Sequence, residues 1–248
     1  MELKKIKPNT SGSRNYIKLN RKNLDKKPLL KNYIIGKKNT AGKNNSGKIT
    51  VRHKGGGHKK KYRILNNYKT PNINGIVCSI EYDPFRNVPI ISIFDYESKN
   101  YFYMIAPKNI KKGDIIRVGR HAELKTGHIL PLSKIPIGSL IHNISTNPKK
   151  LGILTRSSGT FSQLIEKSSL KCKVKLSSGK LITLPLDCKA TLGTVANENF
   201  FLSNVGKAGR SRWLNKRPST RGVAMNPIDH PNGGGEGKKS SKKRTPWG

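Results

Sequence analysis

The chain has 248 residues, and its 50 lysines and arginines against 13 aspartates and glutamates give a formal net charge of +37. Only 33% of the residues are hydrophobic, below the roughly 45–50% of ordinary globular chains, so part of the chain lies outside any core. The charge indicates nucleic acid as the partner, and a membrane partner is disfavoured because the sequence has no apolar run of spanning length, no lipid signal and no amphipathic helix.

Residues 1–47 are predicted to form a basic N-terminal extension. Lysine, asparagine and glycine crowd this stretch, and short apolar clusters cannot offset an ordering cost of about 1–2 kcal/mol per residue. We therefore expect an irregular arm that becomes ordered on its partner. Gly42, Gly47 and Lys48 match the start of a phosphate-binding P-loop. Ile49 follows where a magnesium-binding hydroxyl is required, so a basic turn is the better interpretation.

The stretch GKITVRHKGGGHKKKYRI, residues 47–64, combines a short strand pattern with a basic glycine loop. Apolar and polar residues alternate over 49–52, which predicts the strand. Three glycines separate His53 from His58, and no cysteine or carboxylate stands beside them, so metal ligation is disfavoured. Glycine lets backbone N–H groups approach phosphates closely, and arginine forks match phosphate oxygens. The predicted RNA contacts are Arg52, His53, Lys54, Gly55, Gly56, Gly57, His58, Lys59, Lys60, Lys61 and Arg63.

From residue 62 to residue 119 the hydrophobic pattern has a period of two, as in half-buried strands. The segments YRILNNY, GIVCSIEYD, PIISIFDY, NYFYMIAP and DIIRVG are separated by turn residues. Five short strands at this spacing predict a small antiparallel barrel over residues 48–122. An OB-type barrel is the natural candidate, although the number of strands leaves other barrels open.

Residues 123–200 continue in this style and predict a second small barrel, of SH3-like size. LPLSKIP, SLIHNIS and GILTRSSGTF precede the clearest hairpin, in which KCKVKL and KLITLP flank the turn SSG. The period of two directs Cys172 and Val174 inward and the neighbouring lysines outward, where they are either solvated or in contact with RNA. The predicted fold is thus mostly β, with two small barrels and long basic N- and C-terminal extensions.

Residues 201–248 are predicted to form a C-terminal extension rich in glycine and proline. Its centre, GVAMNPIDHPNGGGEG at 222–237, has no helix or strand pattern, because Pro227 and Pro231 remove backbone donors and the glycines open left-handed conformations. RSRWLNKRPSTR and KKSSKKR flank it, so we expect a tail without a core of its own that folds on RNA. The predicted contacts are Lys207, Arg210, Arg212, Trp213, Lys216, Arg217, Arg221, Asn226, His230, Gly233, Gly234 and Gly235.

The adjacent Asp229 and His230 raise the alternative of a Ser–His–Asp enzyme. Sequence neighbours rarely give triad geometry, and no GxSxG nucleophile elbow is present, so we predict that the chain is not an enzyme and that His230 fixes the path of its loop. Cys78, Cys172 and Cys188 show no CxxC spacing, which disfavours a disulfide framework and a zinc site. No cofactor or metal is expected, and any structural Mg²⁺ would belong to the RNA.

Several long motifs occur in one order along the chain. They are GKITVRHKGGGHKKKYR, IEYDPFRN, AELKTGHILPL, IPIGSLIHNI, LTRSSGT, DCKATLGTV, GKAGRSRW and GVAMNPIDHPNGGGEG. Together they closely resemble the bacterial-type large-subunit ribosomal protein L-two family, from about residue 40 to Gly248. Two features depart from the family: Asn232 stands where histidine is usual, and the chain ends at KRTPWG without a further basic tail.

The resemblance implies an OB-type domain followed by an SH3-like domain. It also implies a primary binder of large-subunit ribosomal RNA that supports assembly, subunit association and the architecture around the peptidyl-transferase centre. Neighbouring ribosomal proteins and the small subunit would be its other partners, with no small-molecule substrate. Arg86 and Arg156 stand where the family places RNA-contacting arginines.

Composition bears on the source of the chain. The wealth of lysine, asparagine and isoleucine suggests an A/T-rich coding sequence, and the resemblance leaves little room for a transit peptide. With the early C-terminal stop, these features favour a ribosome of the mitochondrion, with the plastid or the bacterial cytoplasm as alternatives. A general nucleic-acid compactor is a further alternative, against which the two β domains and the specific loops speak.

Overall fold

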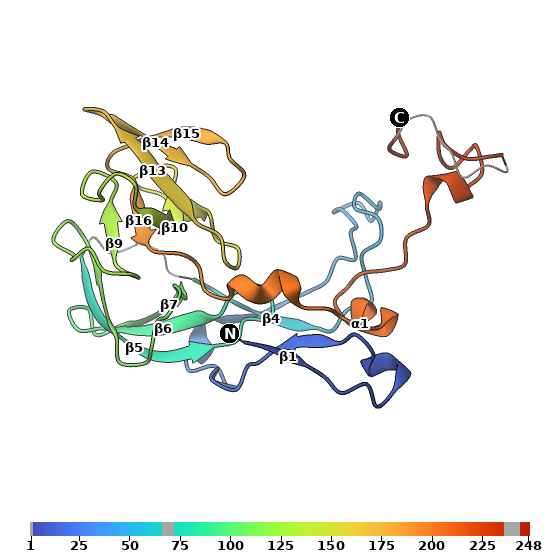
Figure 1. Ribbon diagram of the computed structural model, residues 1–248, viewed down its shortest axis with the longest axis horizontal. Helices are drawn as coiled ribbons and strands as arrows, with labels where there is room; N and C mark the ends of the chain where they lie inside the picture. The colour runs from blue at the N-terminus through green and yellow to red at the C-terminus, as the bar shows by residue number, and fades with distance from the viewer. Residues whose placement is uncertain (1, 66–71, 236–243) are drawn as a thin grey trace. The chain divides into compact units, whose positions relative to one another are not determined.

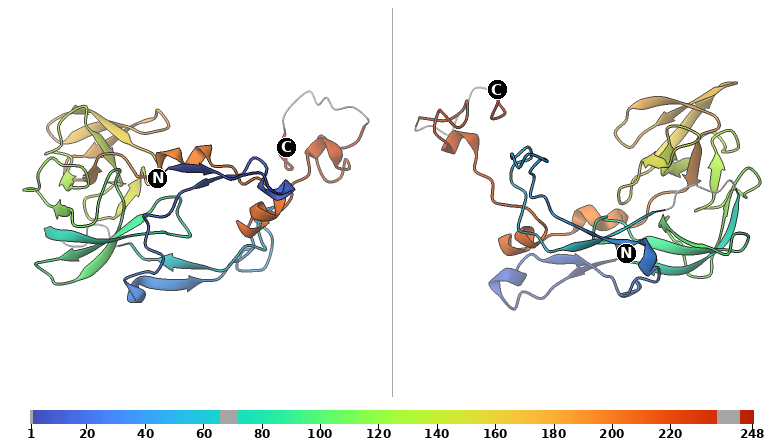
Figure 2. Two further views of the ribbon diagram at one scale, coloured as in Figure 1. Left: turned by 60° about the horizontal axis from the view of Figure 1, so that its bottom comes forward. Right: turned by 180° about the vertical axis from the view of Figure 1, so that it is seen from behind.

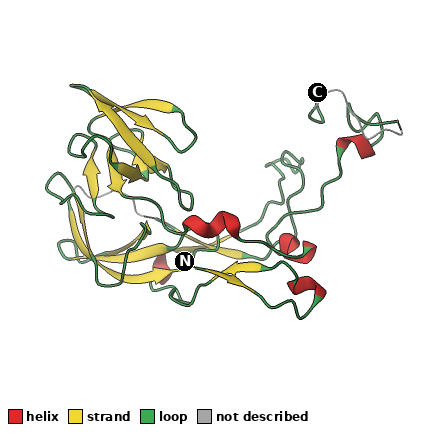
Figure 3. Cartoon of the chain, in the orientation of Figure 1, coloured by secondary structure: helices red, strands yellow, loops and turns green. Residues whose placement is uncertain are grey.

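The computed structural model describes residues 2–65, 72–235 and 244–248. The chain folds into two compact units. The first, here called the β unit, comprises Met1–Lys37 and Lys59–Lys207, and the second, the loop unit, comprises Lys38–His58 and Ala208–Gly248. Strands dominate the described secondary structure, and the few helices are short (Figure 1, Figure 3). None of the described helices is long and apolar enough to cross a membrane.

Four strands form the first half of the β unit: β5 (Ile73–Glu81), β6 (Ile90–Asp95), β7 (Tyr101–Ile105) and β8 (Ile115–Val118). The long strand β5 pairs antiparallel with β6 on one side and β8 on the other. Alternate residues of β5 are buried, as the period of two predicts. Val77, Ile93 and Ile116 belong to the apolar core between these strands.

The second half of the β unit has its own core, which includes Ile141, Leu164 and Val174. Its strands are β9 (Ile129–Pro131), β10 (Leu140–His142), β11 (Ile144–Ser145), β12 (Gly152–Leu154), β13 (Ser162–Lys167), β14 (Lys171–Lys175), β15 (Leu181–Pro185) and β16 (Lys189–Leu192). The predicted hairpin is confirmed as β14 and β15, which run side by side with β13 (Figure 1, Figure 2). Cys172 and Val174 are buried on its inner face, and Lys171, Lys173 and Lys175 are exposed on the other.

One ten-stranded sheet runs through both halves in the order β15-β14-β13-β10-β16-β9-β8-β5-β6-β7. Its two halves join where β8 meets β9 in a short parallel contact. In the described residues each end strand, β15 or β7, has one neighbour, so the sheet is open. The predicted fold class is confirmed: the chain is mostly β, with two barrel-like halves and basic extensions.

Residues before the first half hold more regular structure than the sequence analysis predicted. β1 (Leu3–Lys5) pairs with β2 (Ile17–Leu19), and β3 (Ile34–Lys37) pairs with β4 (Lys60–Arg63). Two 3₁₀ helices, η1 (Ser11–Ser13) and η2 (Lys31–Tyr33), lie between these strands. The expectation of an irregular arm over residues 1–47 is therefore wrong. No residue from 2 to 54 is buried, however, so these pairs have no apolar core of their own.

A buried polar network attaches the N-terminal segment to the sheet. The Glu81 side chain, 1% exposed, accepts hydrogen bonds from the Leu29 N–H (2.9 Å) and from the Tyr103 hydroxyl (2.9 Å). The Tyr103 hydroxyl in turn accepts the Leu30 N–H at 2.9 Å. Burial, together with the nearby Glu81 carboxylate, raises the pKa of Tyr103 to about 12, so the phenol stays protonated. Neither residue was singled out in the sequence, because alternation alone cannot show which inward polar side chain meets a distant segment.

Three predicted features differ from the structure. Residues 49–52 form no strand: Ile49 and Val51 are 65% and 46% exposed, because no neighbouring strand covers them. The first predicted strand, YRILNNY, appears as β4, which pairs with β3 and not with the ten-stranded sheet; its residues 66–68 lie outside the described residues. Strands β13 and β16 were not predicted.

The division into units also differs from the predicted domains. Residues 48–58 belong with the C-terminal segment in the loop unit, and not with the first barrel. The described residues of the loop unit include the short α-helix α1 (Ala208–Trp213) and the 3₁₀ helix η4 (Gly222–Ala224). The remaining 3₁₀ helix of the described residues, η3 (Glu198–Leu202), lies in the β unit.

Candidate nucleic-acid interface

The two basic stretches that the sequence analysis singled out separately lie together in the loop unit. The loop HKGGGH runs antiparallel to residues 213–218, with a bridge between Lys54 and Lys216. The N–H groups of Gly55, His58 and Arg217 donate to the carbonyls of Asn215 (3.3 Å), Trp213 (3.1 Å) and His53 (3.0 Å). Predicted contact residues at positions 53–58 and 213–217 thereby lie side by side, although the two segments are more than 150 positions apart in the sequence.

The middle glycines of this loop are explained by the fold. Gly56 has a φ of +69°, a left-handed conformation that favours glycine. A Cβ on Gly57 would lie 2.6 Å from the Asn215 Cβ and 2.8 Å from its backbone nitrogen. At Gly57 the lack of a side chain therefore allows two protein segments to approach closely. A close approach of the glycine backbone to phosphate stays a prediction.

The C-terminal loop folds around His230. The His230 ring lies directly on Gly222, where a Cβ would come within 2.4 Å of it, and the residue is only 7% exposed. Its Nδ1 accepts the Asn232 N–H at 3.0 Å, so Nδ1 is the unprotonated nitrogen. The carbonyl of His230 accepts the Gly233 N–H at 2.8 Å. The expectation that this stretch contains no helix is therefore wrong at Gly222–Ala224, which form η4, while its folding on RNA stays a prediction.

The same geometry bears on the catalytic alternative. Among the described residues, no hydrogen bond joins the Asp229 carboxylate to His230, and Asp229 is exposed. The Nδ1 of His230 accepts a hydrogen bond from the backbone of its own loop. The arrangement lacks the carboxylate–imidazole pair of a triad and fits a histidine that fixes the loop.

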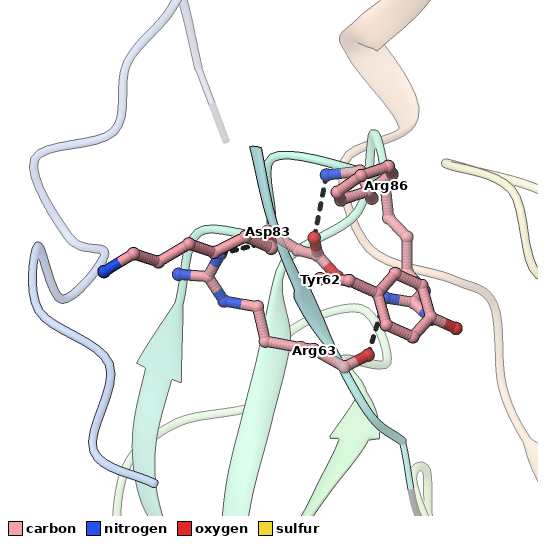
Figure 4. Close-up of polar contacts among 6 residues, drawn as sticks. Tyr62, Arg63, Asp83 and Arg86 are labelled. Atoms are coloured by element: carbon pink, nitrogen blue, oxygen red, sulfur yellow. Dashed lines mark hydrogen bonds and ion pairs between the residues drawn. The ribbon is translucent and has the colours of Figure 1, made fainter. Parts of the chain in front are cut away.

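Arg86 lies in a different setting, at the turn after β5 (Figure 4). Its guanidinium bonds the buried Asp83 carboxylate at 2.5 Å and donates to the Arg63 carbonyl at 3.2 Å and the Tyr62 hydroxyl at 3.0 Å. Asp83 is fully buried, and its other oxygen accepts the Phe85 N–H at 2.8 Å. Arg86 thus clamps β4 to the turn, and its predicted RNA contact stays a prediction.

Two other predicted arginines are also turned toward the protein. Arg63 is 7% exposed and donates to the Lys61 carbonyl at 3.0 Å. Arg156 is half-buried and donates to the Gly152 carbonyl at 3.1 Å. These contacts hold loops in place, a role that sequence patterns do not separate from phosphate binding.

The remaining predicted residues lie mostly at the surface. Exposed members in the described chain are Arg52, His53, Lys54, Gly56, His58, Lys59, Lys61, Lys207, Trp213, Lys216, Arg217, Arg221, Asn226, Gly234 and Gly235. Gly57, Lys60, Arg210, Arg212 and Gly233 are half-buried, and Gly55 is buried. Among the described residues, no group of three or more His, Cys, Asp or Glu side chains could hold a metal ion.

Sequence reasoning missed an aromatic pair beside Arg86. Tyr62 and Phe85 meet edge to face, with ring centroids 5.5 Å apart. Lys37 and Lys60 lie over these rings at 5.6 to 6.0 Å. The available signal was the presence of aromatic residues inside the motifs that hold Tyr62 and Phe85, but their pairing depends on the contacts of Arg86 that join β4 to the turn after β5.

Open β-sheet halves, glycine loops and clustered basic side chains are the features of an RNA-binding protein built on small β-barrels. Comparison with known families agrees. Residues 30–118 match the family model "Ribosomal Proteins L2, RNA binding N-terminal domain", and residues 125–248 match "Ribosomal Proteins L2, C-terminal domain". The chain therefore belongs to the ribosomal protein L2 family, a family of ribosomal proteins and not of enzymes, as predicted.

Individual relatives give the same result. The chain is 45% identical to large ribosomal subunit protein uL2 of Rickettsia peacockii (strain Rustic). It is 44% identical to the protein of that name from Rickettsia prowazekii (strain Madrid E). Each similarity covers 100% of this chain and 92% of the relative.

Proposed function

We propose that the chain is a structural constituent of the large ribosomal subunit and binds its ribosomal RNA through the loop unit and through exposed basic residues of the β unit such as Lys59 and Lys61. The single observation that carries this proposal is the pairing of the HKGGGH loop with residues 213–218, which brings predicted contacts from two distant basic stretches side by side. Full-length similarity to large-subunit proteins supports the same role. The protein would act by positioning RNA and not by chemistry of its own.

Binding to large-subunit ribosomal RNA tests this function. Neutralising roughly 8–10 phosphates would give a slope of log K against log salt of about −6 to −9. The control is an unrelated RNA of equal length at the same salt. A slope near −1, or equal affinity for both RNAs, would contradict the proposal, and the second outcome would favour a general compactor.

The finer assignments rest on the proposed function. We expect neighbouring ribosomal proteins and the small subunit as partners, the C-terminal loop near the peptidyl-transferase RNA, and no cofactor besides Mg²⁺ held by RNA. The A/T-rich coding that the composition suggests supports a mitochondrial ribosome. Mass spectrometry of ribosomes purified from mitochondria, plastids and cytosol tests this: a peptide of the chain only in the plastid or cytosolic ribosome would overturn it.

A further inference from the structure

The aromatic pair beside Arg86 lies at the surface, with two lysines over its rings. Tyr62 projects from β4 and Phe85 from the turn after β5, and Phe85 is 38% exposed. In the β3–β4 register, Lys37 stands opposite Lys60 and Ile35 opposite Tyr62, so the two lysines and Tyr62 share one face of the hairpin. Lys37, Lys60, Tyr62 and Phe85 are here called the Tyr62–Phe85 cluster.

The rings of this cluster are held by the network beneath them. Arg86 donates to the Tyr62 hydroxyl at 3.0 Å, and its guanidinium lies 4.9 Å from the centre of the Tyr62 ring. Asp83 holds the backbone of Phe85 through a hydrogen bond of 2.8 Å. The ion pair between Arg86 and Asp83 therefore fixes the positions of both rings. Side chains that bind a ligand need such support, whereas side chains without a binding role do not.

The charge above the rings is positive and unneutralised. The Nζ of Lys37 lies 5.6 Å from the centre of each ring, and that of Lys60 lies 6.0 Å from the centre of the Phe85 ring. Among the described residues, neither lysine has a carboxylate within ion-pair distance, while Asp83 below is bonded to Arg86. An acidic protein segment would contact only the lysines, and an apolar segment would contact only the rings. A nucleotide would contact both, because its flat base stacks on a ring and its phosphate binds the lysines.

We propose that the Tyr62–Phe85 cluster is a stacking site for an unpaired nucleotide of the bound RNA. The base stacks on the Phe85 ring, Tyr62 packs against that ring edge to face, and Lys37 and Lys60, which lie over Phe85 in the unbound chain, move to bind the adjoining phosphates. This site rests on the proposed function, because it names the kind of RNA element that the β unit takes. It adds base stacking to an interface otherwise built of phosphate contacts.

A matched pair of substitutions separates stacking from charge. Phe85→Leu in the full-length chain removes a ring and no charge, so affinity for large-subunit ribosomal RNA falls roughly 5- to 150-fold with an unchanged salt slope. Tyr101→Leu is the control, because Tyr101 is 42% exposed in the same half and also packs on an aromatic ring; its affinity stays within about twofold of the parent. Phe85→Trp restores binding, since indole also stacks.

Two further measurements complete the test. Lys37→Gln with Lys60→Gln makes the salt slope shallower by about 0.7 to 0.9 for each lysine. Ultraviolet cross-linking of the full-length chain to large-subunit ribosomal RNA joins Phe85 or Tyr62 to an unpaired nucleotide, identified by mass spectrometry. Circular dichroism confirms that each variant keeps the parental β spectrum.

The possible failures are distinguishable. If the parent does not prefer large-subunit ribosomal RNA to unrelated RNA, the proposed function fails. If the parent binds specifically while Phe85→Leu binds as tightly, or if Phe85 cross-links only to another ribosomal protein in assembled subunits, the stacking site is wrong and the function stands.

Discussion

In the β unit, side chains such as Ile93, Ile141 and Leu164 are completely withheld from water, whereas among the described residues of the loop unit only Gly55 and His230 are buried. The first unit therefore draws its stability from apolar burial. The second is held by backbone hydrogen bonds and by glycines that allow two segments to approach closely. The β unit is therefore a rigid support, whereas the conformation of the loop unit can adjust when a partner binds.

The two units also use histidine differently. His142 of the β unit is fully buried, with its Nδ1 2.9 Å from the Gly193 carbonyl and no hydrogen-bond partner for Nε2 among the described residues. His230 of the loop unit stacks on Gly222 and accepts a backbone N–H. Each ring therefore bonds to a backbone group, His142 to a carbonyl and His230 to an N–H, and the architectural role of His230 stays a prediction.

The largest expected effect comes from truncating matched isoleucines, one in each unit. Ile141→Ala in the β unit should lower the free energy of unfolding by about 2–5 kcal/mol, because Ile141 is fully buried and leaves a cavity. Ile228→Ala in the loop unit should change it by less than about 0.5 kcal/mol, since Ile228 is 93% exposed. Urea denaturation of the full-length chain measures both. Similar losses for the two variants would show that the loop unit has a core after all.

A pH titration should sharpen the comparison between the histidines. Burial lowers the pKa of His142 from its ordinary 6.5 to about 4, and the hydrogen bond to Gly193 opposes this only in part. As the pH falls from 6.5 to 4, the unfolded chain binds a proton that the folded chain does not. The free energy of unfolding should therefore fall across this window, by roughly 3 kcal/mol in all.

The control for this titration is His142→Asn. Its side-chain amide can donate in place of Nδ1 but does not titrate. Denaturation midpoints measured at several pH values should show a shallower loss in the variant between pH 6.5 and pH 4. If the two curves run parallel, His142 does not set the acid stability of the β unit.

The features that could be predicted from the sequence also differ between the β unit and the loop unit. Strands β5 to β8 and the β14–β15 hairpin were predicted because burial on one face imposes a period of two. The sequence also singled out residues of the glycine loops as RNA contacts, but it did not predict the pairing of HKGGGH with residues 213–218. That pairing depends on backbone groups, which carry no sequence signal of their own.

The inward role of the arginines could not be predicted either. Arg86 stands in the motif IEYDPFRN, and only the fold shows that its neighbour Asp83 is buried and takes its guanidinium. The contact of Glu81 with Leu29, in contrast, joins residues far apart in sequence. The long-range partners of Arg86 are the Arg63 carbonyl and the Tyr62 hydroxyl, and the residue type alone does not reveal such structural bonds.

Removing the Tyr103 hydroxyl should test how the N-terminal segment is attached to the β unit. Tyr103→Phe leaves the Leu30 N–H and one Glu81 oxygen without their partner, so the free energy of unfolding should fall by about 1–3 kcal/mol. Tyr101→Phe, on the same strand but 42% exposed, is the control and should change little. Hydrogen exchange at Leu29 and Leu30 should accelerate only in the first variant. An equal exchange rate in both would mean that the network does not hold the segment.

The smallest effect on overall stability is expected from a pair of glycines in the loop unit. Gly57→Ala places a Cβ within 2.6 to 2.9 Å of Asn215, which must move away, whereas Gly209→Ala on α1 meets nothing within 4 Å. Gly57→Ala should therefore open the pairing with residues 213–218 and speed amide exchange at Gly55, His58 and Arg217, whose N–H groups donate across it. Gly209→Ala should leave those rates unchanged or slow them, because alanine favours a helix by about 1 kcal/mol over glycine. The free energy of unfolding of the β unit should change by less than about 0.5 kcal/mol in both variants, since neither glycine belongs to its core. A loss of several kcal/mol in the Gly57→Ala variant would mean that the loop pairing supports the whole chain and would remove the distinction between support and loops.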